Sequence, residues 1–138
     1  MTETPPAADG RHRGQCHCGA VTFAVLAPLA VTIEDCNCSI CRKSGYLHLL
    51  VPADCLNVTQ GTHDLVAYRF NTGTAVHTFC RHCGVKPFYV PRSNPDGYSV
   101  NLRCLERSTF TTITVVPFDG RNWERNAASL RERTRPRA

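Results

Sequence analysis

Seven of the nine cysteines gather in three short motifs whose spacing points to metal binding. The motifs are GQCHCGAV, with Cys16 and Cys18; CNCSIC, with Cys36, Cys38 and Cys41; and FCRHCG, with Cys80 and Cys83. A Cys-x-Cys pair holds two sulfurs on a short tether, where a disulfide would be strained. The same tether lets two thiolates converge on one zinc ion at about 2.3 Å. The odd number of cysteines also fits poorly with a complete set of disulfides.

The two outer motifs resemble each other and together supply four thiolates. Each ends in a glycine, Gly19 or Gly84, which lets the backbone turn so that its N–H groups face the sulfurs. Four thiolates form the closed, tetrahedral ligand set of a structural zinc site. We therefore expect a structural zinc that ties the start of the chain to its middle. Its predicted ligands are Cys16, Cys18, Cys80 and Cys83.

The middle motif offers only three thiolates, Cys36, Cys38 and Cys41. Three protein ligands and one exchangeable position are typical of a catalytic zinc. The alternative is a second structural site, completed by another side chain. The candidates for a fourth ligand are Cys55, Cys104, His48 and His82.

The charge of an open three-thiolate site favours thiol chemistry over hydrolysis. Zinc with three thiolates carries a net negative charge, so it polarises water weakly, yet it can hold an incoming thiol as its thiolate. The thiolate is the nucleophilic form of a thiol. Arg42 and Lys43 follow the motif directly and are candidates to bind an anionic, thiol-bearing substrate. The alternative for these two residues is a solvated basic turn.

The elements that must position these cysteines read as short strands. Runs rich in β-forming residues are separated by Gly, Pro, Asn and Asp, which is typical of an all-β sandwich or a barrel-like pair of sheets. The predicted strands lie within residues 19–28, 47–52, 58–70, 76–80, 85–91, 98–105 and 110–118. A short C-terminal helix is expected within residues 122–133, with Asn122 as its cap.

The 138 residues fit one domain with tails. We expect a flexible lead-in over residues 1–13, a zinc-binding domain over residues 14–124 and an arginine-rich helix or tail over residues 125–138. The sequence contains neither a secretory signal nor a long apolar segment, so we expect a cytoplasmic protein that does not enter membranes. Residues 121–138 carry six arginines against two glutamates, which we interpret as a solubilising face rather than a nucleic-acid-binding surface.

The remaining histidines and Tyr46 receive structural interpretations. His17 and His82 lie inside the cysteine motifs, which already contain enough sulfur to bind the metal. His48 and His77 lie in apolar strand-like runs, where a hydrogen-bonded structural histidine is the more common case. Tyr46 could line an open site or pack in the core.

The order and spacing of the motifs resemble those of a known family. GQCHCGAV, CNCSICRKSG, FCRHCG and YSVNLRCL, with the late FDGRNWE, are similar to the glutathione-dependent formaldehyde-activating enzymes, also called the centromere protein V family. The similarity covers roughly residues 13–124.

The resemblance implies a mainly β fold of packed antiparallel sheets, related to the Mss4-like zinc-binding folds. It also implies two zinc ions: a structural one at the four outer cysteines and a looser, partly occupied one at the middle three. The implied activity is that of a carbon–sulfur lyase, which reversibly joins glutathione and formaldehyde to S-(hydroxymethyl)glutathione. A zinc-stabilised binding module without catalysis remains the alternative.

Overall fold

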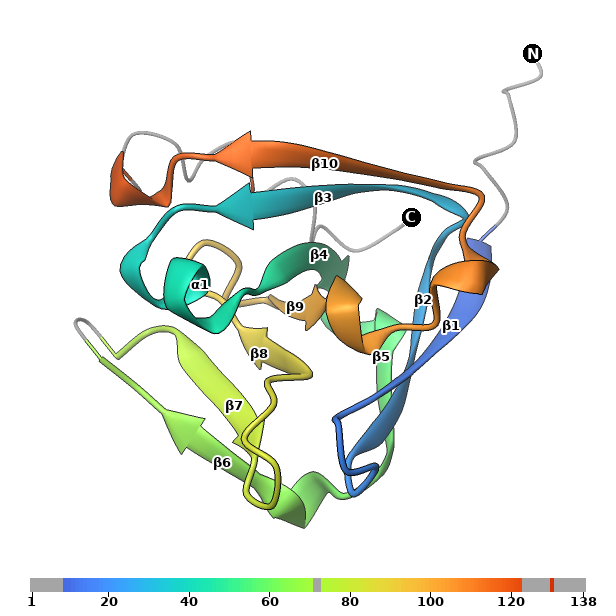
Figure 1. The fold of residues 1–138 in the computed structure, drawn as a ribbon, viewed down its shortest axis with the longest axis horizontal. Coiled ribbons are helices and arrows are strands. Elements are labelled where there is room, and N and C mark those ends of the chain that lie inside the picture. The colour runs from blue at the N-terminus through green and yellow to red at the C-terminus, as the bar shows by residue number, and fades with distance from the viewer. Residues whose placement is uncertain (1–8, 71–72, 123–129, 131–138) are drawn as a thin grey trace.

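The structure, a computed structural model, describes residues 9–70, 73–122 and 130, and it is built mainly from β-strands (Figure 1). The described residues form a three-stranded sheet in the order β1-β2-β5 and a seven-stranded sheet in the order β10-β3-β4-β9-β8-β7-β6. The strands are β1 (Asp9–Gln15), β2 (Thr22–Pro28), β3 (Ala30–Cys36), β4 (Leu47–Pro52), β5 (Leu56–Gln60), β6 (Leu65–Tyr68), β7 (Val76–Cys80), β8 (Phe88–Val90), β9 (Gly97–Asn101) and β10 (Thr112–Phe118). The predicted mainly β fold with packed sheets is therefore confirmed.

Helical elements are short and serve as connections between strands. The helix α1 (Ser39–Ser44) follows β3 and ends at Gly45. Single 3-10 turns are η1 (Ala53–Cys55), η2 (Thr62–Asp64), η3 (Leu102–Cys104), η4 (Arg107–Thr109) and η5 (Gly120–Asn122). In the described ranges, no helix is long and apolar enough to span a membrane.

One strand pair of the larger sheet is parallel, whereas the other pairs are antiparallel. β3 and β10 run side by side from the pair Ala30 and Thr112 to the pair Cys36 and Phe118, as Figure 1 shows. Parallel strands end at the same edge of a sheet. The chain after β10 therefore arrives beside Cys36, although more than eighty residues separate Phe118 from Cys36 in the sequence.

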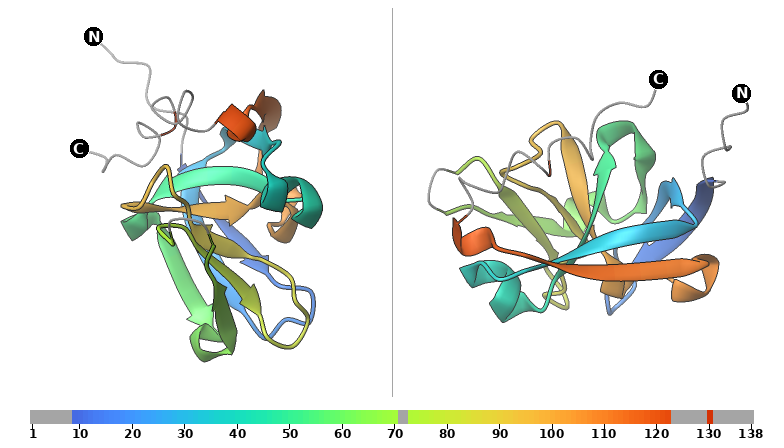
Figure 2. Two further views of the ribbon diagram at one scale, coloured as in Figure 1. Left: turned by 90° about the vertical axis from the view of Figure 1, so that its left-hand side faces the viewer. Right: turned by 90° about the horizontal axis from the view of Figure 1, so that it is seen from above.

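The hydrophobic core is formed by buried residues from both sheets. Figure 2 shows the two sheets from two further directions. Phe23 on β2 meets Phe88 on β8 edge to face, with ring centroids 5.3 Å apart. Burial of an aromatic side chain of this size contributes about 1.5–3 kcal/mol. The core also holds the buried aliphatic residues Val21, Val25, Ile33, Leu49, Val100 and Leu102.

The strand β1 was not predicted, because its sequence DGRHRGQ has no apolar alternation. Its inward positions are taken by His12 and Gly14 instead. His12 is buried, stacks on Phe110 at 3.9 Å and hydrogen-bonds the Thr109 hydroxyl and the Ala27 carbonyl. Residues 9–13 therefore belong to a sheet, and the predicted domain boundary at residue 14 falls inside a strand.

Two other expectations differ from the structure or lie outside it. The predicted strand over residues 58–70 is divided into β5 and β6 by the turn η2. The predicted helix over residues 122–133 and the tail over 125–138 lie almost wholly outside the described residues.

Candidate metal sites and the adjoining pocket

The two outer cysteine motifs come together at one end of the sheets. Cys16 and Cys18 lie in the turn between β1 and β2, whereas Cys80 ends β7 and Cys83 lies in the turn that follows. The four sulfurs all lie within 4.8 Å of one another. The sulfur of Cys18 is 3.7 Å from the sulfurs of both Cys16 and Cys80. Sulfurs placed tetrahedrally around zinc at about 2.3 Å would be separated by about 3.8 Å, so this group fits a zinc ion.

Local backbone geometry turns both motifs around their sulfurs. Gly19 and Gly84 adopt the left-handed conformation, with φ of 82° and 76°, which other residues rarely adopt. The N–H of Val21 donates to the Cys16 sulfur and the N–H of His82 donates to the Cys80 sulfur, each at 3.4 Å. Such hydrogen bonds stabilise thiolates. Backbone N–H groups therefore face the sulfurs in both glycine-bearing turns, as the sequence predicted.

The three middle cysteines form a second group at the edge where β3 ends. Cys36 ends β3, Cys38 precedes the first turn of α1, and Cys41 lies in that helix, with the three sulfurs within 4.8 Å of one another. Hydrogen bonds with Cys36 and Cys41 lower the pKa of the Cys38 thiol to about 2. Hydrogen bonds to Cys36 and Cys38, with burial, raise the pKa of Cys41. The protein alone thus favours one thiolate here, and three thiolates would need a bound cation.

None of the predicted fourth ligands joins this second group within residues 9–70 and 73–122. The Cys55 thiol lies against Asp54, and the Cys104 thiol lies against the carbonyl of Lys86. His82 pairs with the Asp64 carboxylate at 3.0 Å. His48 comes nearest, since its Nε2 is 3.0 Å from the Cys41 sulfur.

His48 is held by a buried hydrogen-bond network beside the second group. Its Nδ1 lies 2.7 Å from the Ser99 hydroxyl and 3.4 Å from the Tyr89 hydroxyl. Burial lowers the pKa of His48 to about 3, so the ring is neutral near pH 7. A neutral imidazole has one donor and one acceptor. With Nε2 donating to the Cys41 sulfur and Nδ1 accepting from Ser99, the ring would have one fixed tautomer and would orient that sulfur.

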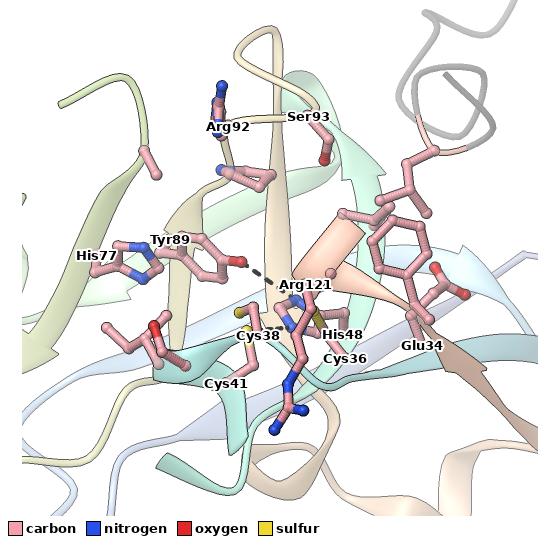
Figure 3. Close-up of a pocket in the computed structure, with 18 of the residues that line it drawn as sticks. Glu34, Cys36, Cys38, Cys41, His48, His77, Tyr89, Arg92, Ser93 and Arg121 are labelled. Carbon is pink, nitrogen blue, oxygen red and sulfur yellow. Dashed lines mark hydrogen bonds between the residues drawn. The ribbon is translucent and has the colours of Figure 1, made fainter. Parts of the chain in front are cut away.

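A pocket of about 400 Å³ opens over the three middle cysteines (Figure 3). Figure 3 shows His77 and Tyr89 on one side of the sulfurs, and the carboxylate of the buried Glu34 on the other. Ile40, Leu50, Phe70, Phe118 and Leu130 give the walls an apolar character. Pockets of this size enclose small organic molecules.

Comparison with known proteins decides the family. Residues 11–117 match the sequence model of the family described as glutathione-dependent formaldehyde-activating enzyme. The chain belongs to this family. The match begins inside β1 and ends inside β10, so it covers both sheets and both cysteine groups.

Two individual proteins are similar to this member of the formaldehyde-activating family. A Halomonas elongata protein that carries the family's name as a provisional assignment is 38% identical over 79 residues. That alignment covers 51% of this chain, and the chain spans about half the length of the curated relative it matches. A Rhodobacter sphaeroides protein of known crystal structure is 36% identical in sequence to this chain. The two structures superpose with a TM-score of 0.63, and the alignment covers 75% of this chain and 99% of that one.

The pocket over the three middle cysteines is not lined by Arg42 or Lys43, the two basic residues that the sequence suggested as substrate-binding. Because Cys41 faces inward from the short helix α1, the next two positions turn outward. Arg42 and Lys43 are accordingly exposed, and Lys43 lines a second, more open hollow beside Tyr68. The cationic side chains that line the pocket are instead Arg92 and Arg121.

Sequence reasoning missed most of the residues around the sulfurs. Arg92 lies in the loop after β8 and Arg121 in η5, and neither belongs to a cysteine motif. His48 and His77 were interpreted as structural histidines, yet both line the pocket. A signal for His48 was available, since it is the single ionisable residue in LHLLVP, a strand buried at every position.

Proposed function

We propose that this chain is a zinc-dependent enzyme that reversibly joins a thiol and an aldehyde, acting as a carbon–sulfur lyase in the direction of cleavage. Glutathione and formaldehyde are the substrates that the family's name suggests. The observation that carries the proposal is the placement of three thiols, with no fourth ligand among the described residues, at the floor of a 400 Å³ pocket.

The two cysteine groups would hold zinc in different roles. Cys16, Cys18, Cys80 and Cys83 would form a saturated site, which stabilises the fold. Cys36, Cys38 and Cys41 would form a site with an exchangeable position that faces the pocket. Zinc bound there would supply one function, to hold an incoming thiol as its nucleophilic thiolate.

The protein groups around the sulfurs suit a thiol that carries negative charge. Arg92 and Arg121 would bind carboxylates of the substrate, because guanidinium groups pair with carboxylates through two parallel hydrogen bonds. The Glu34 carboxylate, 3% exposed, would face a substrate ammonium group. A peptide-like thiol with both kinds of charge, such as glutathione, would satisfy all three side chains.

The reaction itself needs a small, dry space and a proton. The thiolate sulfur attacks the carbonyl carbon, a C–S bond forms, and the carbonyl electron pair moves to oxygen, which then takes a proton. Cleavage follows the same path in reverse. Tyr89, His48 and Phe70 line the pocket and would exclude water from the aldehyde carbon.

Exchange NMR with zinc-loaded protein, glutathione and ¹³C-formaldehyde tests this proposal. We expect the protein to accelerate interconversion with the adduct beyond the uncatalysed rate, and a chelator to abolish the acceleration. An uncatalysed rate in the presence of protein with bound zinc would contradict the proposal. The non-catalytic, zinc-stabilised binding module would then be the better description.

A further inference from the structure

A half-buried lysine and a buried histidine form a pair at the side wall of the pocket. His77 on β7 lies directly across from Tyr89 on β8, and their rings stack with centroids 4.3 Å apart. The Phe70 ring covers the imidazole as well, with centroids 5.3 Å apart. The ring of His77 is therefore clamped between aromatic faces, and only its edges can make hydrogen bonds.

The hydrogen bond to Lys86 sets the tautomer of His77. Lys86 Nζ lies 2.9 Å from His77 Nδ1. An ammonium group can only donate, so Nδ1 accepts, and the neutral ring carries its proton on Nε2. Figure 3 shows this imidazole at the pocket wall, beside the ring of Tyr89.

The surroundings of Lys86 are unusual for a structural lysine. Among the described residues, no carboxylate forms an ion pair with it. Its ammonium group lies instead 5.0 Å from the ring centre of Tyr46 and 4.8 Å from that of Tyr89. Lys86 does not line the pocket, whereas His77 does, so the imidazole stands between the ammonium group and the substrate space.

The two pocket histidines differ in what they can still do. Both ring nitrogens of His48 are engaged, one with Cys41 and the other with Ser99. In the described ranges, no protein group is hydrogen-bonded to Nε2 of His77. Of the two histidines, His77 is the one that can present an N–H to a substrate oxygen.

We propose that Lys86 and His77 form a proton relay that serves the aldehyde oxygen, an inference that rests on the proposed function. As the C–S bond forms, the proton on Nε2 of His77 passes to the alkoxide oxygen. The Lys86 ammonium group gives a proton to Nδ1 at the same time, so the imidazole stays neutral and Lys86 becomes an amine. Lys86, which is only half-buried, then takes a proton from water, and the ring returns to its first tautomer by proton exchange with water. Cleavage of the adduct moves each proton in the opposite direction.

Electrostatics support this role. Burial, and then the charge of Lys86, lower the pKa of His77 to about 4, so the ring is neutral near pH 7. Burial also lowers the pKa of Lys86 below its ordinary value, which makes the ammonium group a better acid. The titratable groups that face the pair are Tyr46, His48, Tyr68, Tyr89, Cys38 and Cys41.

Substitutions at the two positions separate the relay from structural effects. His77→Phe keeps the stacking and removes the proton carrier, and Lys86→Arg keeps the charge but cannot release a proton. We expect each to slow interconversion by roughly 100-fold, with zinc content and glutathione binding unchanged. Arg107→Met, at an exposed site, is the control and should behave as the unsubstituted protein. The unsubstituted protein should form the C–S bond faster than Lys86→Arg. This advantage should shrink as pH rises through the pKa of Lys86, because Lys86 then loses the proton that it would donate.

Nitrogen-15 NMR of the imidazole adds a measurement that does not depend on activity. We expect Nε2–H in the unsubstituted protein and a mixture of tautomers in Lys86→Met. Variants that match the unsubstituted rate, or an Nδ1–H tautomer, would overturn the relay and leave the proposed function standing. If the unsubstituted protein itself gives no acceleration, the relay falls together with the proposed function.

Discussion

With zinc in both cysteine groups, as proposed, replacing Gly120 with alanine should empty the three-thiol site and leave the four-thiol site filled. Gly120 opens η5 and lies directly against the middle cysteines. A Cβ atom at this position would overlap the Cys36 sulfur and lie 3.0 Å from the Cβ of Cys38. Because such atoms normally contact at about 3.5–4.0 Å, the sulfur would have to move by roughly 1.2–1.7 Å. Zinc–ligand distances tolerate only about 0.2 Å, so Cys36 could no longer act as a ligand.

The expected result is a loss of one zinc per chain, measured by mass spectrometry of the metal after gel filtration. The stability cost should be about 1–3 kcal/mol, which is usual for an added methyl group in a packed site. Gly45→Ala is a matched control. Gly45 has φ of 67°, so alanine would be strained there by about 1–2 kcal/mol, but its Cβ would meet no atom within 4 Å.

Two outcomes would refute this reasoning. If Gly120→Ala keeps both zinc ions and the rate of thiol–aldehyde exchange, η5 does not pack on the cysteines as described. If Gly45→Ala loses the same zinc, reduced stability alone empties the site, and the contact with Cys36 is not the cause.

Three further predictions concern the fold and the pocket. Cys83→Ser should lower the melting temperature of the whole domain in a circular dichroism scan, because the zinc proposed there would contribute to folding. Cys41→Ser should mainly reduce activity, and equal unfolding of both variants would contradict the division of roles. Tyr46→Phe loses a 2.6 Å hydrogen bond to a buried carbonyl of β9, so urea titration should show a loss of about 1 kcal/mol. Arg121→Glu should weaken glutathione binding in calorimetry far more than Arg42→Glu, and equal effects would argue against the pocket as the binding site.

The grouping of the cysteines was accessible from the sequence because short tethers limit what they can do. Two sulfurs in a Cys-x-Cys or Cys-x-x-Cys motif can reach one ion whatever the surrounding fold, and the glycines indicate the turn. The sequence also predicted that the two outer motifs share one zinc ion, because two pairs of thiolates supply the four ligands of a tetrahedral site. The structure places those four sulfurs within 4.8 Å of one another, with the three middle sulfurs in a separate group.

The rest of the site depends on topology, which local sequence does not encode. Arg121 reaches the pocket because β10 runs parallel to β3 and therefore ends beside Cys36. Parallel strands are joined by a long connection, so their pairing cannot be read from neighbouring residues. Arg42, predicted to bind substrate, is exposed and does not line the pocket, because it follows Cys41, which faces inward from α1. The interpretation of His77 as a structural histidine follows from the apolar strand-like run around it. Its contact with Lys86, nine residues away on another segment, depends on the pairing of β7 with β8, which the local sequence does not show.

The four-thiol group also has a consequence for biosynthesis. Cys16 and Cys18 are translated more than sixty residues before Cys80 and Cys83. At roughly 5–20 residues per second, that interval lasts about 3–13 s. During it the growing chain carries the first two thiols, and then the middle three, without the partners that complete the outer site. Oxidants and competing metal ions can reach those thiols in this interval, so the supply of zinc and reductant during expression should determine how much correctly loaded protein a cell yields.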